Sequence, residues 1–279
     1  MAHGCLSDTR LAALLDDDVP CGDLTTESLG IGESPGRLRM SARGAMTLCA
    51  VEEAARVLEL CGTTVVVRAT SGSCVGEDGA ILDAAGSAGS LHRGWKLAQT
   101  LIEWASGIAS AAAAVVQAAG GVPVACTRKH VPGAKALAVK AVRAGGAIVH
   151  RLGLSETLLV FPEHALFLTE PPADTVARLH RAQPEKKIVV EVGTLAAALH
   201  WAAAGVDGLQ LERFAPRELA DCRRALDART ESRRLLLLAA GGVRPDNAAA
   251  YAAAGADVLV TSYPYTATPR DVRVVFANA

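Results

Sequence analysis

Aromatic residues are scarce in this sequence. Phe, Trp and Tyr make up 4% of the 279 residues, whereas hydrophobic residues as a whole make up 51%. The core must therefore be built mainly from Ala, Val and Leu side chains. The length suits one large domain or two modest ones with a sizeable core.

An excess of either sign of charge is also lacking. Lys and Arg number 28 and Asp and Glu number 29, which gives a formal net charge of -1. A balanced chain is not attracted as a whole to nucleic acid or to a membrane surface. We therefore expect neither partner, and any site for an anion must be a local concentration of positive charge.

Paired cysteines, a signal peptide and long apolar runs are absent as well. No C-x-x-C pair or ligand-like spacing occurs among Cys5, Cys21, Cys49, Cys61, Cys74, Cys126 and Cys222. Such scattering favours reduced thiols in a cytoplasmic protein over a disulfide framework or a zinc site. The N-terminal MAHGCLSDTR has no basic region before an apolar core, and Arg, Glu, Gly or Pro interrupts each apolar run. We expect a soluble, cytoplasmic protein with no metal site of its own.

The first third of the chain mixes short helices and strands without a regular repeat. A helix is predicted over residues 7–15, capped by Ser7 or Asp8. A hairpin is predicted over residues 36–50 and a second helix over residues 51–61. The acidic loop DDDVPCGDLTT is either a metal cluster or, as we favour, a solvated turn.

The pattern changes near Leu91, where a long helical stretch begins that is broken at Gly94 and ends at Gly120 and Gly121. Short β-rich runs then alternate with Ala-rich helical runs. The seven candidate strands are VPVACT, AIVHR, TLLVF, KIVVEV, GLQLE, LLLLAAG and DVLVTS. Nearly continuous apolar strands between helices predict a parallel sheet buried on both faces, and hence an α/β barrel. An open doubly wound sheet has the same alternation and is the alternative.

The carboxyl ends of these strands carry an unusual number of charged residues. In chain order the ends hold Thr127, Arg128, Lys129, His150, Arg151, Phe161, Glu191, Glu212, Gly241, Gly242, Thr261 and Ser262. Barrels place their active sites at this edge of the sheet. Charges at the ends of four apolar runs exceed what solubility requires, so we expect the site here.

The cations among these residues indicate an anionic ligand. Arg128 and Lys129 follow one strand, and Arg151 follows the next. His150 by itself would more often be a core histidine, but its neighbour Arg151 and its place at a strand end favour a site. The intervening helix adds Lys135, Lys140 and Arg143. These three either join the cationic mouth or form a solvated helix face.

The loops after the last two strands predict a phosphate site, because barrels commonly hold phosphate there. The glycines of Ala240-Gly241-Gly242 let backbone N–H groups approach an anion, and the next helix adds a partial positive charge. Thr261 and Ser262 end the last strand. An ordinary strand-to-helix turn is the alternative, but the nearby cations favour phosphate.

Two acidic residues, Glu191 and Glu212, end neighbouring strands. Their carboxylates could bind ribose hydroxyls or a metal, or balance the arginines. A structural ion pair is the alternative for each of them.

Several motifs together resemble the quinolinate (nicotinate-nucleotide) phosphoribosyltransferase family. They are GDLTTE from residue 22, SGIAS at residues 106–110, TRKHVPG, AVRAGGAIVHR, VEVGTL and the late Gly-Gly. They cover nearly the whole chain, and the T-R-K-x-x-P-G and A-V-R-x-G-G-x-x-x-H-R spacings are highly specific. HRLGLSETLLVFPEH and VTSYPY are most similar to the ModD branch, the pyrophosphorylases linked to molybdenum-transport genes.

The resemblance implies an N-terminal α/β sandwich domain over residues 1–103. An atypical, roughly seven-stranded parallel α/β barrel over residues 104–279 would follow. It also implies a homodimer or higher homo-oligomer whose active sites are shared between partners. The family joins a pyridine carboxylic acid to phosphoribosyl pyrophosphate with Mg²⁺ and releases pyrophosphate, and the quinolinate enzymes also release carbon dioxide.

Roles follow from the resemblance by position. Arg128, His150 and Arg151 would bind the acid substrate. Lys129 would contact the phosphoribosyl donor and Glu191 the ribose, while the late Gly-Gly would hold the 5′-phosphate. Lys129, Glu191 and Glu212 are thus the predicted catalytic residues.

Four departures from the quinolinate enzymes stand out. Lys96 aligns with the arginine that crosses the dimer, and keeps its charge without its bidentate fork. Phe161 stands where the family has a carboxylate-binding lysine, Glu212 replaces an aspartate, and Ala239-Ala240 replaces a serine-rich turn. Loss of a buried cationic partner costs a dicarboxylate about 2–5 kcal/mol. The phosphate side is largely kept and the quinolinate side is altered.

We therefore predict a ModD-like phosphoribosyltransferase acting on a less acidic aromatic or heterocyclic acid. The alternative enzyme is nicotinate-nucleotide diphosphorylase (carboxylating), which acts on quinolinate in NAD biosynthesis. A third reading is a non-catalytic protein that binds an oxyanion or a nucleotide in connection with molybdenum transport. A Schiff-base aldolase is disfavoured, because Lys129 lies between an arginine and a histidine.

Overall fold

A computed structural model describes residues 5–229 and 235–279. Its contacts define two compact units. The first comprises Met1–Ala113, His130–Gly146 and Pro264–Ala279, and the second comprises Ala114–Lys129 and Ala147–Tyr263. The predicted boundary between residues 103 and 104 stays a prediction.

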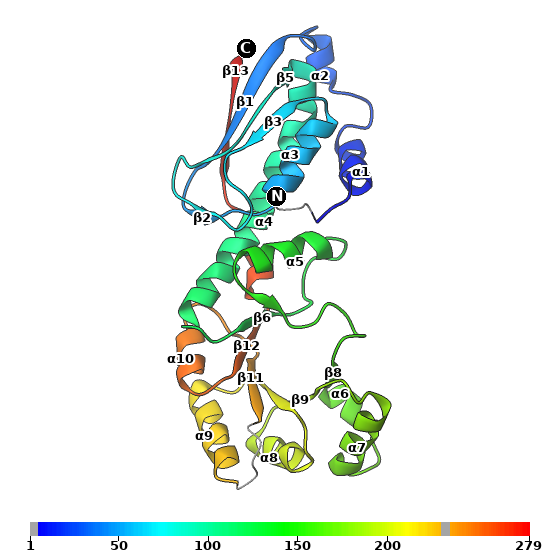
Figure 1. The fold of residues 1–279 in the computed structure, drawn as a ribbon, viewed down its shortest axis with the longest axis vertical. Helices are drawn as coiled ribbons and strands as arrows, with labels where there is room; N and C mark the ends of the chain where they lie inside the picture. Colours follow the sequence, from blue (N-terminus) through cyan, green and yellow to red (C-terminus); the bar gives the residue numbers. More distant parts are fainter. Residues whose placement is uncertain (1–4, 230–234) are drawn as a thin grey trace. The chain divides into compact units, whose positions relative to one another are not determined.

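The first unit is built on a four-stranded antiparallel sheet. Its strands lie in the order β13 (Val272–Asn278), β1 (Pro35–Ala42), β5 (Ala80–Ser87) and β3 (Thr64–Val67). Figure 1 shows β13, the last strand of the chain, beside β1. The C-terminal segment therefore completes the sheet of the N-terminal unit.

The predicted hairpin over residues 36–50 is wrong. β1 pairs with β5 and β13, whereas β2 (Met46–Thr47) pairs with β4 (Cys74–Val75). Alternating residues predict a strand but do not specify its partner, which long-range packing selects. The helix predicted over residues 51–61 is confirmed as α3 (Val51–Leu60), which packs against this sheet.

Two short helices begin at side-chain caps. The predicted N-terminal helix is confirmed as α1 (Asp8–Asp18), and the Ser7 side chain accepts from the Arg10 N–H at its start. α2 (Leu24–Ser28) begins at Asp23, whose carboxylate accepts from the N–H groups of Thr25 and Thr26 at 3.1 and 3.2 Å. Across the described residues no group of three metal-ligating side chains occurs. The acidic loop thus ends in a helix cap.

The long helix α4 (Ala88–Ala118) is continuous, so the break predicted at Gly94 is wrong. Its length and hydropathy would allow a membrane span, but 61% of the relevant window is buried inside the structure, as in a core helix. Its Ser106 and Ser110 hydroxyls accept from the backbone N–H groups of Cys49 and Thr47 at 2.9 and 3.0 Å. The serines of the SGIAS motif therefore hold α4 against the backbone of residues 47–49.

Helix α5 (Lys135–Ala144) corrects one sequence expectation. Lys140 Nζ lies 2.7 Å from Glu52 Oε2 and 2.6 Å from Glu53 Oε2, and the Glu53 side chain is fully buried. Lys140 is thus part of a buried ion cluster within the first unit. It belongs neither to a solvated helix face nor to a cationic mouth.

The second unit contains seven parallel strands, one for each strand predicted there. Their order is β7-β6-β12-β11-β10-β9-β8. Their bounds are β6 Val124–Cys126, β7 Ile148–Val149, β8 Leu158–Val160, β9 Ile188–Val192, β10 Gly208–Glu212, β11 Leu236–Ala240 and β12 Val258–Thr261. The curled sheet stays open, because β7 and β8 are its two edges. It is a half-barrel, which confirms the atypical α/β barrel.

Helices connect these strands and surround the sheet (Figure 1). They are α6 (Pro162–Ala165), α7 (Pro172–Ala182), α8 (Leu195–Ala203), α9 (Pro216–Asp227) and α10 (Ala248–Ala253), and a 3₁₀ turn spans Tyr263–Thr266. At the amino edge of the sheet, Asp207 accepts from the Ile188 N–H at 2.7 Å and Asp257 from the Leu237 N–H at 2.8 Å. These carboxylates hold each strand against its neighbour.

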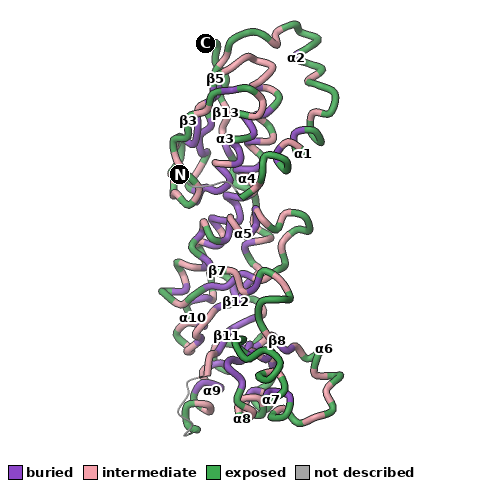
Figure 2. Tube along the Cα trace, turned by 45° about the vertical axis from the view of Figure 1, so that its right-hand side comes forward, coloured by how far each residue is buried: buried purple, intermediate pink, exposed green. Residues whose placement is uncertain are grey.

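Both faces of the sheet are buried over most of its length (Figure 2). On the inner face, Ala125, Leu238, Ala240 and Val260 form one apolar cluster. The alternate residues Leu209, Leu211, Leu237 and Leu259 are fully buried too. Apolar residues therefore fill both sides of each strand, and polar ones mark the edge where the strands end.

Candidate active site

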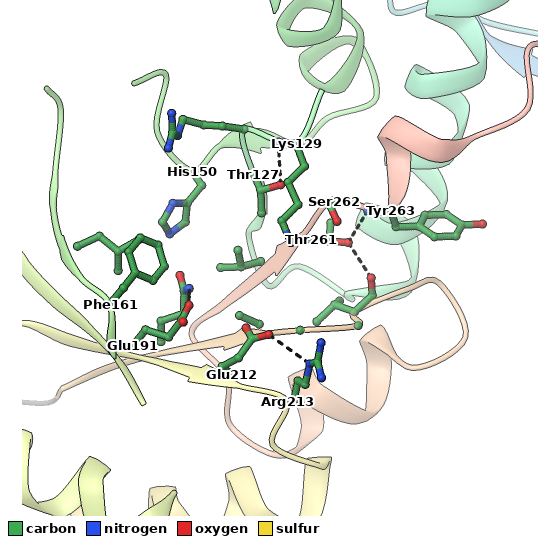
Figure 3. A pocket seen from close by; sticks show the side chains of 18 of the residues that line it. Thr127, Lys129, His150, Phe161, Glu191, Glu212, Arg213, Thr261, Ser262 and Tyr263 are labelled. Atoms are coloured by element: carbon green, nitrogen blue, oxygen red, sulfur yellow. Dashed lines mark hydrogen bonds and ion pairs between the residues drawn. The ribbon is translucent and has the colours of Figure 1, made fainter. Parts of the chain in front are cut away.

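A cavity of about 970 Å³ lies in the second unit. Its lining includes Arg128, Lys129, His150, Arg151, Phe161, Glu191, Glu212, Ala240, Gly241, Gly242, Thr261 and Ser262. These are the residues predicted for the site, apart from Lys96. Figure 3 shows Lys129, His150, Phe161, Glu191 and Glu212 around one space, whereas the Tyr263 ring points away from it. Such a volume is typical of a site for a small-molecule ligand.

The cationic side of the cavity is formed by the segments after β6 and β7. Arg128 and Lys129 are exposed, whereas Arg151 is only 8% exposed. Burial and, after it, the Arg128 charge lower the pKa of Arg151. Among the described residues, no carboxylate forms an ion pair with Arg151. A buried guanidinium without an acidic partner is suited to an anionic ligand.

His150 lies half-buried beside this arginine. Its backbone N–H donates to the Cys126 carbonyl at 2.9 Å, which fixes the chain just past β7. Burial first, and then the positive charge of Arg151, lower the pKa of His150. The imidazole is therefore neutral near pH 7 and can either donate or accept a hydrogen bond.

Phe161 gives the cationic side an aromatic wall. The Arg151 guanidinium carbon lies 5.5 Å from the centre of its ring. The His164 ring stacks with the Phe161 ring at a centroid distance of 5.8 Å, and His164 Nδ1 accepts from the Phe161 N–H at 2.9 Å. The ring is thus held between Arg151, which follows β7, and His164 of helix α6.

The acidic side is formed by β9 and β10. Glu191 Oε2 accepts from Gln210 Nε2 at 2.5 Å. Burial is the main cause that raises the pKa of Glu191, the nearby Glu212 and Glu163 carboxylates add to it, and the Gln210 hydrogen bond opposes it. Glu212 lies 3.6 Å from the exposed guanidinium of Arg213. The two carboxylates remain close to the cavity and available to a ligand.

The glycine turn after β11 closes the third side. Gly241 has a φ of +82°, and a Cβ there would lie 2.7 Å from both Arg213 Cγ and Glu212 Oε1, so only glycine fits. Gly242 has a φ of +98° and open space where its Cβ would be. The Thr261 hydroxyl donates to the Val243 carbonyl at 2.7 Å, which ties the turn to β12.

Helix α10 has only six residues, so the dipole contributes less at this turn than the sequence suggested. Arg244 lines the cavity beside the glycines and pairs with Asp246 at 3.0 Å. Sequence reasoning missed Arg244, although it lies two residues after the Gly-Gly in GGVRPDN. It adds a cation to the predicted phosphate side.

Sequence reasoning also missed Gln210 and Glu163, which line the cavity. Gln210 is a polar residue in the otherwise apolar strand GLQLE, and this contrast was a readable signal. Lys96 lies elsewhere, in the first unit, and does not line the cavity. Its Nζ is 4.2 Å from the centre of the Trp95 ring and 3.0 Å from Gln99 Oε1.

Cations, two carboxylates and a glycine turn at the ends of parallel strands suit a ligand that carries phosphates. Comparison with known proteins gives the class of enzyme, a phosphoribosyltransferase. The models "Quinolinate phosphoribosyl transferase, N-terminal domain" and "C-terminal domain" match residues 23–106 and 108–275. The chain belongs to the quinolinate phosphoribosyl transferase family.

The similar proteins include relatives with two different names. "Putative pyrophosphorylase ModD" of Rhodobacter capsulatus is 47% identical over 249 residues, covering 88% of this chain and 95% of the relative. A "Probable nicotinate-nucleotide pyrophosphorylase [carboxylating]" of Synechocystis is 29% identical over 94% of this chain and 89% of its own. Among solved structures, NadC from Streptococcus pyogenes has a TM-score of 0.87 and 25% identity, covering 98% of this chain and 96% of that one.

Proposed function

We propose that this enzyme transfers phosphoribose from phosphoribosyl pyrophosphate to an aromatic or heterocyclic acid other than quinolinate, as a ModD-type pyrophosphorylase. One observation carries the proposal. The cavity keeps the cations and the glycine turn expected for the donor, but presents the Phe161 ring beside Arg151 where a second carboxylate would need a cation. A dicarboxylate would leave one charge poorly compensated, whereas an aromatic monocarboxylate would be matched.

In this proposal different sides of the cavity bind the phosphates, the ribose and the acceptor. Lys129 and the Gly241-Gly242 turn hold the phosphates of the donor. The Glu191 and Glu212 carboxylates orient the ribose and stabilise positive charge that develops at its reacting carbon. Arg151 holds the acceptor carboxylate, so that the acceptor nitrogen and the ribose carbon approach in line.

We propose that Mg²⁺ binds beside Glu191 and Glu212 together with phosphoribosyl pyrophosphate. The described residues form no group of three metal-ligating side chains, so the protein alone offers too few ligands. Mg²⁺ is commonly held by one or two carboxylates together with substrate phosphates, and Glu191 and Glu212 would supply the carboxylates. When bound, Mg²⁺ would offset the charge of the departing pyrophosphate.

We also propose a cytoplasmic homodimer or higher homo-oligomer in which the partner supplies Lys96. The supporting observation is that Lys96 is exposed and does not line the cavity of its own chain. A link to molybdenum transport is part of the same proposal, and it rests on the resemblance to the ModD branch alone.

The second candidate function is quinolinate phosphoribosyl transfer with decarboxylation. The relatives named carboxylating nicotinate-nucleotide pyrophosphorylases favour it, and so does the retained, buried Arg151. The two functions differ in whether a second carboxylate on the acceptor helps or hinders binding.

Pyrophosphate release separates them. Purified protein is given phosphoribosyl pyrophosphate, Mg²⁺ and, one at a time, quinolinate and a panel of pyridine and benzene monocarboxylic acids. We expect release with at least one monocarboxylate and little with quinolinate. Greater pyrophosphate release with quinolinate than with any monocarboxylate would establish the second candidate function. Tight molybdate binding without any pyrophosphate release would favour a binding protein.

A matched pair of variants tests the donor site. Lys129→Ala should abolish binding of phosphoribosyl pyrophosphate in titration calorimetry, whereas Lys135→Ala, which removes an exposed lysine of α5, should leave it unchanged. Equal donor binding by Lys129→Ala and the unmodified protein would refute the role given to Lys129.

A further inference from the structure

Gln210 lines the cavity with only 5% of its surface exposed. Among the polar residues of the cavity wall only Thr261, at 4%, is more deeply buried. It lies in the middle of β10, on the inner face of the sheet that also carries Glu212. The two polar atoms of its side-chain amide differ in their hydrogen bonding. Nε2 donates to Glu191 Oε2 at 2.5 Å, whereas Oε1 is buried without a hydrogen-bond partner among the described residues.

Chemistry fixes the orientation of this amide. An ionised carboxylate only accepts hydrogen bonds, so beside ionised Glu191 the –NH₂ end of Gln210 faces the carboxylate and the carbonyl faces elsewhere. Glu191 is the register partner of Gln210 on β9, and Leu238 is its partner on β11. Glu191, on one side, already accepts the hydrogen bond from the amide nitrogen. The side chain of Leu238, on the other side, has no hydrogen-bond donor.

The neighbours of Gln210 along and across the strands on the inner face are otherwise apolar or acidic. Leu238 belongs to the apolar cluster with Ala125, Ala240 and Val260 on the same inner face. Two positions along β10, Glu212 brings a carboxylate, which cannot donate. A buried carbonyl without a hydrogen-bond partner is unfavourable, so this position suits a donor that comes from a ligand.

We propose that Gln210 is a specificity-determining residue that accepts a hydrogen bond from an N–H or O–H group on the aromatic acceptor. The inference rests on the proposed function and names the acceptor class more narrowly: a planar ring with a carboxylate for Arg151 and a donor group for Gln210. The flat apolar cluster beside the amide suits a ring edge. The ribose hydroxyls of phosphoribosyl pyrophosphate would instead donate to the Glu191 and Glu212 carboxylates.

Matched probe pairs test this assignment by titration calorimetry. Nicotinate is compared with 2-aminonicotinate and 6-aminonicotinate, and benzoate with its three amino isomers, so that each pair differs only in an N–H donor. For the unmodified protein at least one amino isomer should bind about tenfold more tightly than its parent, the factor expected of one such hydrogen bond. Equal binding within every pair, or no binding of any amino probe, would overturn the assignment.

A variant at the same position sharpens the test. Gln210→Met removes the carbonyl at similar volume and should reduce the amino preference to less than about twofold, while the parent acids bind as before. The exposed Gln183→Met makes the same chemical change away from the cavity and should alter nothing. A preference that survives in Gln210→Met would refute the proposal.

A separate titration with phosphoribosyl pyrophosphate distinguishes the two possible sources of the donor group. If Gln210→Met weakens binding of phosphoribosyl pyrophosphate and leaves the amino preference intact, the carbonyl serves the ribose and the inference fails while the proposed function stands. If the unmodified protein does not bind phosphoribosyl pyrophosphate but shows a Gln210-dependent amino preference, the proposed function fails and the assignment of Gln210 stands.

Discussion

The Arg151 guanidinium carbon lies 5.5 Å from the centre of the Phe161 ring. This pairing gives the anion site a flat aromatic wall beside a buried positive charge. A planar acid can stack against such a wall while its carboxylate contacts the guanidinium. In the proposed function, an aromatic ring at position 161 in place of a cation changes both the charge and the shape of the acceptor side.

Phe161→Lys should strengthen quinolinate binding on the order of tenfold to a hundredfold, because the second carboxylate gains a cation in a partly desolvated site. Titration calorimetry with quinolinate measures the change. Phe167→Lys makes the same substitution at a residue that is 87% exposed and outside the cavity, and it should have no effect. Unchanged quinolinate affinity in Phe161→Lys would show that Phe161 does not set acceptor charge.

Lys140→Met should destabilise the protein by about 3–5 kcal/mol, because the buried carboxylate of Glu53 loses its cationic partner. Urea unfolding followed by circular dichroism measures the loss. Lys135→Met, on the exposed part of the same helix, should stay within about 0.5 kcal/mol of the unmodified protein. Equal stability of the two variants would contradict a structural role for the Lys140 cluster.

The same cluster predicts a loss of stability in acid. Burial would raise the pKa of Glu52, but hydrogen bonds from Lys140 and Ser71 outweigh it and hold the pKa below its usual value of 4.5. A lowered pKa contributes stability above the usual value and loses it as pH falls through the folded-state pKa. Urea midpoints measured from about pH 6 to about pH 3 should fall below pH 4.5. Lys140→Met should flatten that dependence.

Gly241→Ala should be more damaging than Gly242→Ala. Both residues have positive φ, which costs a residue with a Cβ about 1–2 kcal/mol. Only at Gly241 would the added carbon also lie 2.7 Å from Arg213 and Glu212 atoms. Thermal unfolding and calorimetry with phosphoribosyl pyrophosphate should therefore show larger losses for Gly241→Ala, and equal losses would rule out the steric argument.

Strand-end chemistry could be predicted from the sequence because it depends on local order. Each apolar run ends where its charged or glycine residues begin, and parallel strands bring such ends to one edge. Arg128, Arg151 and Glu191 could thus be assigned to one cavity before the fold was known. The same reasoning identified the seven strands of the second unit.

Residues whose function depends on a distant partner could not be predicted. Lys140 looked like part of a solvated or cationic helix face, yet Glu52 and Glu53, far away in the chain, surround it. Gln210 looked like an isolated polar residue in a strand until the register with Glu191 and Leu238 was known. Neither relationship leaves a periodic signal in the sequence.

The sequence by itself determined the alternation of strands and helices, the cationic and acidic strand ends and the glycine turn, because these follow from hydrophobic periodicity and backbone preference. Only the tertiary structure decided that β13 completes the first sheet, that the second sheet stays open between β7 and β8, and which end of the Gln210 amide is free. Strand pairing and register depend on packing between segments far apart in the chain, and that packing selects the partner of each strand.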